Sequence, residues 1–436
     1  MIDIPLLALV IGLFLLLMFL GIPIAFSMGI AGVLGLIILK GWGVFVALTA
    51  LVPFRQINSW VLVCLPLFVL MGNFAEQAGI SNRAYELCYK VFGSLKGGLA
   101  MASIGACAAF GAVTGSSAAA LVTIGTSAIP QMRRYGYSTK LATGCIAAAG
   151  FLAFAIPPSN ILVLYGIICE QSIGKLFMAS MVPGIITAAI FITGTWLMAK
   201  FIPTMAPVTP VKFTLKERVT ASLRLWEVVI LFLIVMGGLY TGVYTASEAG
   251  AIGGFAALIM LLAHRRTRSL RFIYQGMKDA SSTTCMILIV IMSAAFMNLY
   301  MVLGGVAKAI ETSMTSLPVG PTGVIIIIVL MYILMGMFLD TIAMVLLTAP
   351  ILLPVVVNLG YDPIWFGVFV TQMVEVALIT PPMAMNIFIV RGMVPDVPFT
   401  DIAIGIVPYL IMELIVVALL IAFPQIALWL PSLMMS

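Results

Sequence analysis

Residues 153–160 read "AFAIPPSN" and lie within one of the most hydrophobic stretches of the chain. Two adjacent prolines interrupt a helix, because proline lacks a backbone donor and its ring clashes with the carbonyl four residues earlier. Inside a bilayer no water compensates for that loss, so a broken helix is tolerated only where its backbone lines a protected or water-filled site. If this stretch spans a membrane, it predicts a discontinuous helix beside such a site.

The composition indicates a membrane protein. Apolar residues make up 63% of the 436 positions, charged residues only 8%, and the mean hydropathy is +1.24. A soluble globular chain carries about 25% charged residues. Apolar runs of roughly 17 to 25 residues, the length that spans a bilayer, recur from end to end. We therefore expect an all-α polytopic membrane protein.

The chain also repeats itself. Three landmarks recur 224 positions later: Pro130 as Pro354, Gly136-Tyr137 as Gly360-Tyr361, and Pro157-Pro158 as Pro381-Pro382. The same offset carries the apolar segment 178–200 onto 402–424. A constant offset indicates two copies of one structural unit. We expect them at 1–200 and 226–436, joined by a polar linker at 201–225 whose second half forms an amphipathic surface helix.

Basic residues predict how the two copies are oriented. The loop at 131–140 is basic, whereas its counterpart at 355–362 carries no Lys or Arg. The linker and the segment 264–271 are also basic, and an even number of predicted spans separates them. The positive-inside rule places these segments in the cytoplasm, and few basic residues then remain outside: Lys40, Arg55, Lys175 and Lys308. The second copy is therefore expected to be inverted relative to the first.

Each copy contains a predicted re-entrant helical hairpin. In the first, at 98–130, two segments too short to span meet at "GAVTGSSAA". Its counterpart, at 323–353, has "MGMFLDTIA" at the tip. We expect the first hairpin to enter from the cytoplasmic side and the second from the periplasmic side. The discontinuous helices are expected at 139–170 and 363–392, the second interrupted at "ALITPPMAMN".

Hairpin tips and helix breaks predict ion sites. In secondary transporters, half-helix N-termini face anionic substrates, while unwound carbonyls and helix C-termini hold cations. Hard cations prefer oxygen ligands, and hydroxyl oxygens are available here from Thr114, Ser116, Ser117, Thr341 and Thr380. We expect two sodium sites, one in each copy. The structural alternative is that the prolines only kink helices and the small residues only permit close packing.

Acidic residues inside apolar segments are functional candidates, because a charge in the bilayer is unfavourable. Asp340 at the second tip is expected to serve an ion site or to bond the hairpin amides. Glu375 precedes the second break, and a salt bridge or an interior hydrogen bond is an equal alternative to function. Glu248 and Glu413 lie near predicted span ends, where a structural role is expected.

Two asparagines follow the breaks. Asn160 and Asn386 can each bond the unwound backbone or the substrate, and both readings remain open. The only histidine, His264, lies at the edge of a basic segment. Because a proton relay usually needs several ionisable residues in series, the composition favours sodium over protons as the coupling ion.

Four segments resemble the large membrane subunit of tripartite ATP-independent periplasmic (TRAP) transporters, in the ion-transporter superfamily: "GSSAAALVTIGTSAIPQMRRYGYS", "IPPSN", "LDTIAMVLLTAPILLPVVVNLGYDP" and "EVALITPPMAMNIF". The resemblance covers nearly the whole chain. It implies an elevator-type, sodium-coupled importer of a small organic anion, a carboxylate or sialic-type acid, in the bacterial inner membrane. It also implies a periplasmic substrate-binding protein and a small four-helix membrane subunit, which we expect as a separate chain because this one ends soon after its last span.

The resemblance further implies site residues. The first sodium site is expected at Thr114, Ser117, Ala153, Ile156 and Pro157, and the second at Gly336, Ala377, Thr380 and Met383. The substrate is expected between the two tips, at Ser116, Ser117, Pro158, Ser159, Pro382 and Asn386. Ala153 and Ala377 stand where glycine is usual in the family. A backbone ligand tolerates that exchange if its φ is negative.

There are three alternative functions. A standalone proton-coupled or exchange carrier of the same superfamily is the main alternative. An intramembrane enzyme would need a nucleophile with a base, or a metal motif such as HExxH, and a single histidine makes that remote. An ATP-driven pump would need GxxxxGK[ST], and "SIGKLF" (172–177) lacks both the first glycine and the final hydroxyl residue.

Overall fold

A computed structural model describes residues 4–208, 213–264, 269–381 and 384–433, and these residues form helices without a β-strand. In these ranges six helices are long and apolar enough to cross a bilayer, or up to eight if two bent helix pairs each count as one span. The expected all-α polytopic membrane fold is therefore confirmed.

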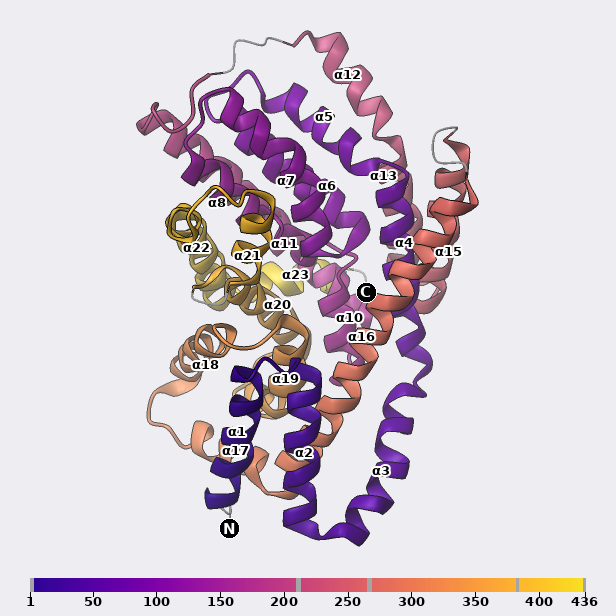
Figure 1. The fold of residues 1–436 in the computed structure, drawn as a ribbon, viewed down its shortest axis with the longest axis vertical. Coiled ribbons are helices and arrows are strands. Elements are labelled where there is room, and N and C mark those ends of the chain that lie inside the picture. Colours follow the sequence, from indigo (N-terminus) through magenta and orange to yellow (C-terminus); the bar gives the residue numbers. More distant parts are fainter. Residues whose placement is uncertain (1–3, 209–212, 265–268, 382–383, 434–436) are drawn as a thin grey trace.

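Helices from both copies form a frame: in Figure 1, α4, α15 and α16 run along the right side, and α1, α2 and α3 lie at the lower end. Within it, α15 packs along α4, and α16 packs along α2, so the two copies are interleaved. A Cβ added at Gly32 would lie 2.7 Å from the backbone nitrogen of Met297, so α2 and α16 touch through their backbones. The frame consists of α1 (Ile4–Phe19), α2 (Ile24–Lys40), α3 (Trp42–Ile57), η1 (Trp60–Val63), α4 (Cys64–Gln77), α13 (Trp226–Phe232), the π-helical η2 (Leu233–Gly237), α14 (Gly238–Tyr240), α15 (Ala246–Ala263) and α16 (Leu270–Leu303).

A second group of helices holds both hairpins and both broken helices. In Figure 1 the first hairpin lies in the upper half and the second in the lower half. The hairpins are α6 (Gly98–Thr114) with α7 (Ser117–Arg134), and α18 (Gly320–Gly336) with α19 (Thr341–Asn358). The broken helices are α8 (Thr139–Ala149), α9 (Leu152–Ala155) and α10 (Asn160–Ile168), and α20 (Pro363–Ile379) with α21 (Met385–Met393). Each copy closes with a long helix, α11 (Ile173–Phe201) or α22 (Phe399–Ala422).

The halves of the broken helices exchange partners between copies. Helix α10 packs on α19 of the second hairpin, and α21 packs on α7 of the first. Helices α8 and α22 cross so closely that a Cβ on Gly405 would overlap the Lys140 carbonyl. The first broken helix also has an interruption at Gly150 that the sequence did not predict. There α8 ends, and a Cβ on Gly150 would lie 3.1 Å from the Ser117 hydroxyl.

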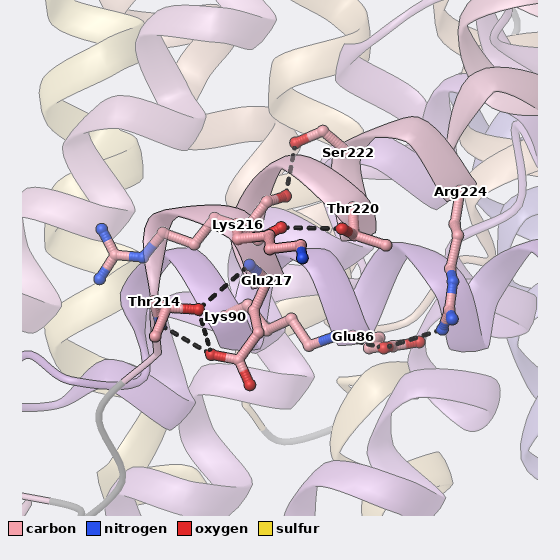
Figure 2. A network of polar contacts seen from close by, with 9 residues as sticks. Glu86, Lys90, Thr214, Lys216, Glu217, Thr220, Ser222 and Arg224 are labelled. Carbon is pink, nitrogen blue, oxygen red and sulfur yellow. Dashed lines mark hydrogen bonds and ion pairs between the residues drawn. The ribbon is translucent and has the colours of Figure 1, made fainter.

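Four shorter helices complete the chain: α5 (Ile80–Phe92), α12 (Leu215–Arg224), α17 (Val306–Thr315) and α23 (Gln425–Leu433). Helix α12 lies in the predicted linker and begins with a capping box, in which Thr214 and Glu217 each bond the other's backbone amide. Figure 2 shows its contact with α5: Arg224 of α12 lies 3.5 Å from Glu86, which also accepts a 2.6 Å bond from Lys90 of its own helix. The linker is therefore attached beside the first hairpin.

Candidate functional site

The first hairpin turns at a glycine that allows a close backbone approach. Gly115 has a φ of +57°, the left-handed conformation that ends many helices. Ser116 then caps α7, and its side chain accepts a 3.4 Å hydrogen bond from the Ala119 amide. A Cβ on Gly115 would lie 2.6 Å from the Pro158 carbonyl oxygen. The first tip and the first helix break are therefore in direct contact.

The first break separates two capped helix ends. Helix α9 stops before Ile156, which is extended at φ −99°, and Ser159 caps α10 by accepting a 3.4 Å bond from the Leu162 amide. A Cβ on Gly111 would overlap the backbone of Ala153. The C-terminal ends of α6 and α9 consequently lie side by side.

The second copy has the same arrangement built from other side chains. Asp340 caps α19 and accepts 3.3 Å bonds from the Ile342 amide and the Thr341 hydroxyl. A Cβ on Gly336 would overlap that of Ala377, so the C-terminal ends of α18 and α20 also lie side by side. The structure thus gives Asp340 the bond to hairpin amides that was one of its two expected roles.

A cavity of about 150 Å³ lies between the two tips. The first residues of four helices, α7, α10, α19 and α21, all line it, together with two frame helices. The lining residues are Leu65, Gly115, Ser116, Ser117, Ala118, Phe154, Asn160, Ile161, Leu164, Thr283, Met286, Ile287, Asp340, Thr341, Ile342, Leu378, Met385, Asn386 and Ile389. None of these residues is basic.

Asn386 connects the two copies at this cavity. Its side chain is buried, and its Nδ2 donates a 2.9 Å bond to the Ala147 carbonyl on α8. The Ser117 hydroxyl donates to Asn386 Oδ1 across 3.5 Å. Asn160, at the start of α10, is half-buried and lines the same cavity. The two asparagines therefore share a location but differ in how tightly they are held.

The structure brings together most of the sequence-predicted residues in two layers. Ser116, Ser117, Asn160, Asp340 and Asn386 line the cavity itself. The others that the structure describes are not among its lining residues and belong to the breaks, the tips and the adjoining helix ends: Thr114, Ala153, Ile156, Pro157, Pro158, Ser159, Gly336, Ala377 and Thr380. Pro382 and Met383 lie outside the described residues.

The backbone φ angles show whether Ala153 and Ala377 can stand where the family usually has glycine. Within the described ranges Glu170 is the one non-glycine residue with a positive φ, so Ala153 and Ala377 both have negative values. Each adopts that conformation without strain.

Several cavity residues were not predicted. Leu65 on α4 and Thr283, Met286 and Ile287 on α16 come from the frame, where no motif marks them. The polar run "ASSTTC" (280–285), inside an apolar helix, is the one sequence signal that could have indicated them.

Two acidic residues differ from expectation. Glu413 is fully buried and lies about two and a half turns from the end of α22, so the assignment to a span end was wrong. Glu413 lies near the middle both of the predicted apolar segment 402–424 and of α22. Glu375 is also fully buried, and in the part of the chain that the structure describes its carboxylate has neither a salt bridge nor a hydrogen bond.

The fold is that of a known class of membrane transporter. The crystal structure of the YdaH transporter of Alcanivorax borkumensis matches with a TM-score of 0.60 over 89% of this chain and 90% of that one. Sequence identity is 12%, so this similarity concerns the fold alone.

The family is defined by sequence. Residues 11–426 match the model described as "Tripartite ATP-independent periplasmic transporter, DctM component", and the chain belongs to this family. It is 30% identical to the C4-dicarboxylate TRAP transporter large permease protein DctM of Rhodobacter capsulatus, over 97% of this chain and 98% of that one. It is 32% identical to the isethionate TRAP transporter permease protein DctMQ of Oleidesulfovibrio alaskensis, covering 87% of this chain and 59% of that longer protein. These relatives are permeases, and the chain is a multi-pass transporter subunit rather than an enzyme.

Proposed function

We propose that the chain is the translocating subunit of a sodium-coupled importer of a small organic anion, a carboxylate or sialic-type acid. The observation that carries this proposal is the arrangement of eight helix ends. Four N-termini line one cavity, and four C-termini meet in two pairs, α6 with α9 and α18 with α20. The C4-dicarboxylate and isethionate relatives support an anionic substrate.

The N-termini favour an anion. A helix N-terminus carries a partial positive charge and presents unbonded amides, which together bind carboxylates and phosphates. Because none of the described lining residues is basic, the substrate anion would rely on these helix ends and on hydroxyl and amide side chains such as Ser117 and Asn160. Asp340 would repel it unless a cation is bound nearby.

The C-termini favour cations. Paired C-terminal ends concentrate carbonyl oxygens and partial negative charge, and sodium prefers such hard ligands. The first site would use Thr114, Ser117, Ala153, Ile156 and Pro157, and the second Gly336, Ala377 and Thr380. Sodium bound at both sites would neutralise Asp340 and strengthen anion binding between the tips. This electrostatic effect is the proposed basis of the coupling between sodium binding and anion binding.

We also propose that the second copy is inverted relative to the first in the membrane and that transport uses an elevator motion. Tyr85 donates a 3.1 Å bond to Gln131, and in the second copy Asn358 donates a 2.7 Å bond to Glu311. The partners are separated by 46 and 47 positions, which supports equivalent roles for α5 and α17. Arg134→Cys and Val357→Cys should then react with an impermeant thiol reagent from opposite membrane faces. Reaction of both from one face would exclude the inversion. Gly360 is unsuitable for this test because its φ is +91°.

We further propose partners and location from the family. A periplasmic binding protein would deliver the substrate, and a small four-helix subunit would accompany this chain in the bacterial inner membrane. Proteoliposomes holding both membrane subunits should therefore take up radiolabelled substrate only with the binding protein outside and an inward sodium gradient. The test panel would be a C4-dicarboxylate, isethionate and a sialic acid.

Two variants and one control test the proposed sites in the same uptake experiment. Thr380→Val should abolish sodium-dependent uptake while the protein still assembles, and Ser117→Trp should do the same by filling the cavity. The control is Thr371→Val on the same helix, whose hydroxyl bonds only the Gly367 carbonyl at 2.9 Å. Uptake driven by a proton gradient, without sodium or a binding protein, would instead support a standalone proton-coupled or exchange carrier.

A further inference from the structure

Three polar side chains lie outside the cavity, where α20 packs against α22. Glu375 and Glu413 are 0% exposed and Gln372 is 1% exposed. Gln372 and Glu375 lie one turn apart, on the same side of α20. Trp365 near the start of α20 donates a 3.0 Å bond to the Leu420 carbonyl near the end of α22. Gln372 and Glu413 each lie seven residues, about two turns, from that contact, so Glu413 on α22 is level with Gln372 on α20. The three side chains therefore form one buried cluster between two helices.

Every polar side-chain atom of this cluster lacks a partner. Both carboxylate oxygens of Glu375, both of Glu413, and the amide oxygen and nitrogen of Gln372 have no hydrogen bond within the described residues. Buried polar groups are otherwise almost always bonded, and an exception in a native structure calls for a functional role or an unseen water or ion. Two carboxylates together make such an exception especially unfavourable.

Neighbouring charges do not compensate for the two carboxylates. On the helices packed against α20 and α22, Lys140 pairs with Asp401 at 3.4 Å, and Lys200 and Arg391 are exposed. Lys175 lies at the start of α11, and the described ion pairs include no contact of any basic residue with Glu375 or Glu413.

We propose that Glu375, Glu413 and Gln372 form a buried site for a hard cation, separate from the two sodium sites at the helix C-termini. The two carboxylates and the amide oxygen offer up to five oxygen ligands, the type that Na⁺ and Ca²⁺ prefer. Ca²⁺ would balance both carboxylates, whereas Na⁺ would require a proton on one of them. A cation here would hold α20 against α22 and so stabilise the helix that leads into the second break.

Equilibrium binding of ²²Na⁺ and, separately, ⁴⁵Ca²⁺ to the full-length chain in lipid nanodiscs tests this site. The double variant Glu375→Gln/Glu413→Gln should bind one cation per chain fewer than the wild type, for one of the two ions. The ion that loses a site identifies the ligand. The control is Glu86→Gln, which removes an exposed carboxylate paired with Lys90 and should keep the full number.

The double variant is expected to fold, because replacing buried charges by neutral groups of similar volume is often neutral or stabilising. If the double variant fails to assemble, Glu413→Gln and Gln372→Met should each weaken the same site at least tenfold. Unchanged numbers and affinities for both ions would overturn the proposal and leave the carboxyl groups as neutral acids. The result does not depend on transport: loss of one cation without any sodium-driven uptake would support this site and refute the proposed function.

Discussion

Thr123 on α7 donates a 2.9 Å hydrogen bond to Glu76 on α4, which joins the first hairpin to the frame. In the second copy, Asn298 on α16 donates a 2.8 Å bond to the Leu346 carbonyl on α19. The sequence offset of 224 carries positions 76 and 123 onto 300 and 347, within two positions of Asn298 and Leu346, so the two contacts lie at corresponding places in the repeated sequence. Each hairpin is thus attached to the frame by a polar contact among largely apolar surfaces.

Removing both contacts should loosen the hairpins. Thr123→Val and Asn298→Leu each delete a hydrogen bond with a net value of about 1 kcal/mol, and the unpaired Glu76 adds a further penalty. Hydrogen exchange measured by mass spectrometry should become faster in α7 and α19 and remain unchanged in α2. Thr126→Val is the matched control, since its exposed hydroxyl bonds only the Thr123 carbonyl. Equal exchange in the double variant and the wild type would show that the contacts do not hold the hairpins.

Gly336 is required by the close approach of α18 to α20. A Cβ there overlaps Ala377 Cβ and lies 2.8 Å from its Cα. Gly336→Ala should destabilise the protein by about 1–3 kcal/mol, the usual cost of overpacking, and should weaken sodium binding at the second site. Adding Ala377→Gly removes the worst overlap, so the double variant should recover part of the melting temperature.

The equivalent exchange in the first copy is its control. A Cβ on Gly111 meets the Cα and nitrogen of Ala153 as well as its Cβ. Ala153→Gly should therefore rescue Gly111→Ala much less than Ala377→Gly rescues Gly336→Ala. Equal rescue in both copies would mean that the two helix contacts are not as close as the structure has them.

The sequence predicted the elements that carry explicit backbone signals. Adjacent prolines located the first break, because proline cannot continue a helix, and "TGSSA" and "LDTIA" located the tips. The interruption at Gly150 was missed, since a lone glycine within an apolar run is compatible with a continuous helix. The reason for a glycine at this position is tertiary, because the Ser117 hydroxyl leaves little room for a side chain at Gly150.

The sequence also did not predict contacts between helices that are far apart along the chain. Thr283 reaches the cavity because α16 packs against α19 of the second hairpin, and no local sequence pattern encodes that packing. Glu375 was recognised as a candidate, but its pairing with Glu413 depends on how α20 meets α22. The exchange of partners, with α10 on α19 and α21 on α7, likewise follows from three-dimensional packing.

An ion pair outside the membrane links the two copies and predicts a pH dependence. Arg133 holds Asp396 with bonds of 2.5 and 3.3 Å, and this hydrogen bonding lowers the pKa of the Asp396 carboxyl. A lowered pKa contributes stability above the ordinary value of about 3.9. The contribution is lost as the pH falls through the lowered value. The melting temperature of the wild type should therefore drop more steeply below about pH 4 than that of Asp396→Asn.

Salt provides the control for this prediction. The pair is exposed, so its effect should be small and should shrink in 1 M NaCl, where the Debye length is about 3 Å. Parallel pH profiles for wild type and Asp396→Asn at low salt would assign the acid sensitivity to other groups.

Asn386 and Asn160 should respond differently to substitution, although each follows a helix break. Asn386→Leu removes the bond to the Ala147 carbonyl and the contact with Ser117, so it should reduce unfolding stability by about 1–3 kcal/mol and abolish uptake. Asn160→Leu changes a half-buried side chain at the cavity wall and should raise the apparent KM with little change in melting temperature. Thermal unfolding and initial uptake rates, measured on the same preparations, separate the two effects. If Asn160→Leu destabilised the protein as much as Asn386→Leu while substrate affinity stayed constant, Asn160 would be a structural residue rather than a substrate ligand.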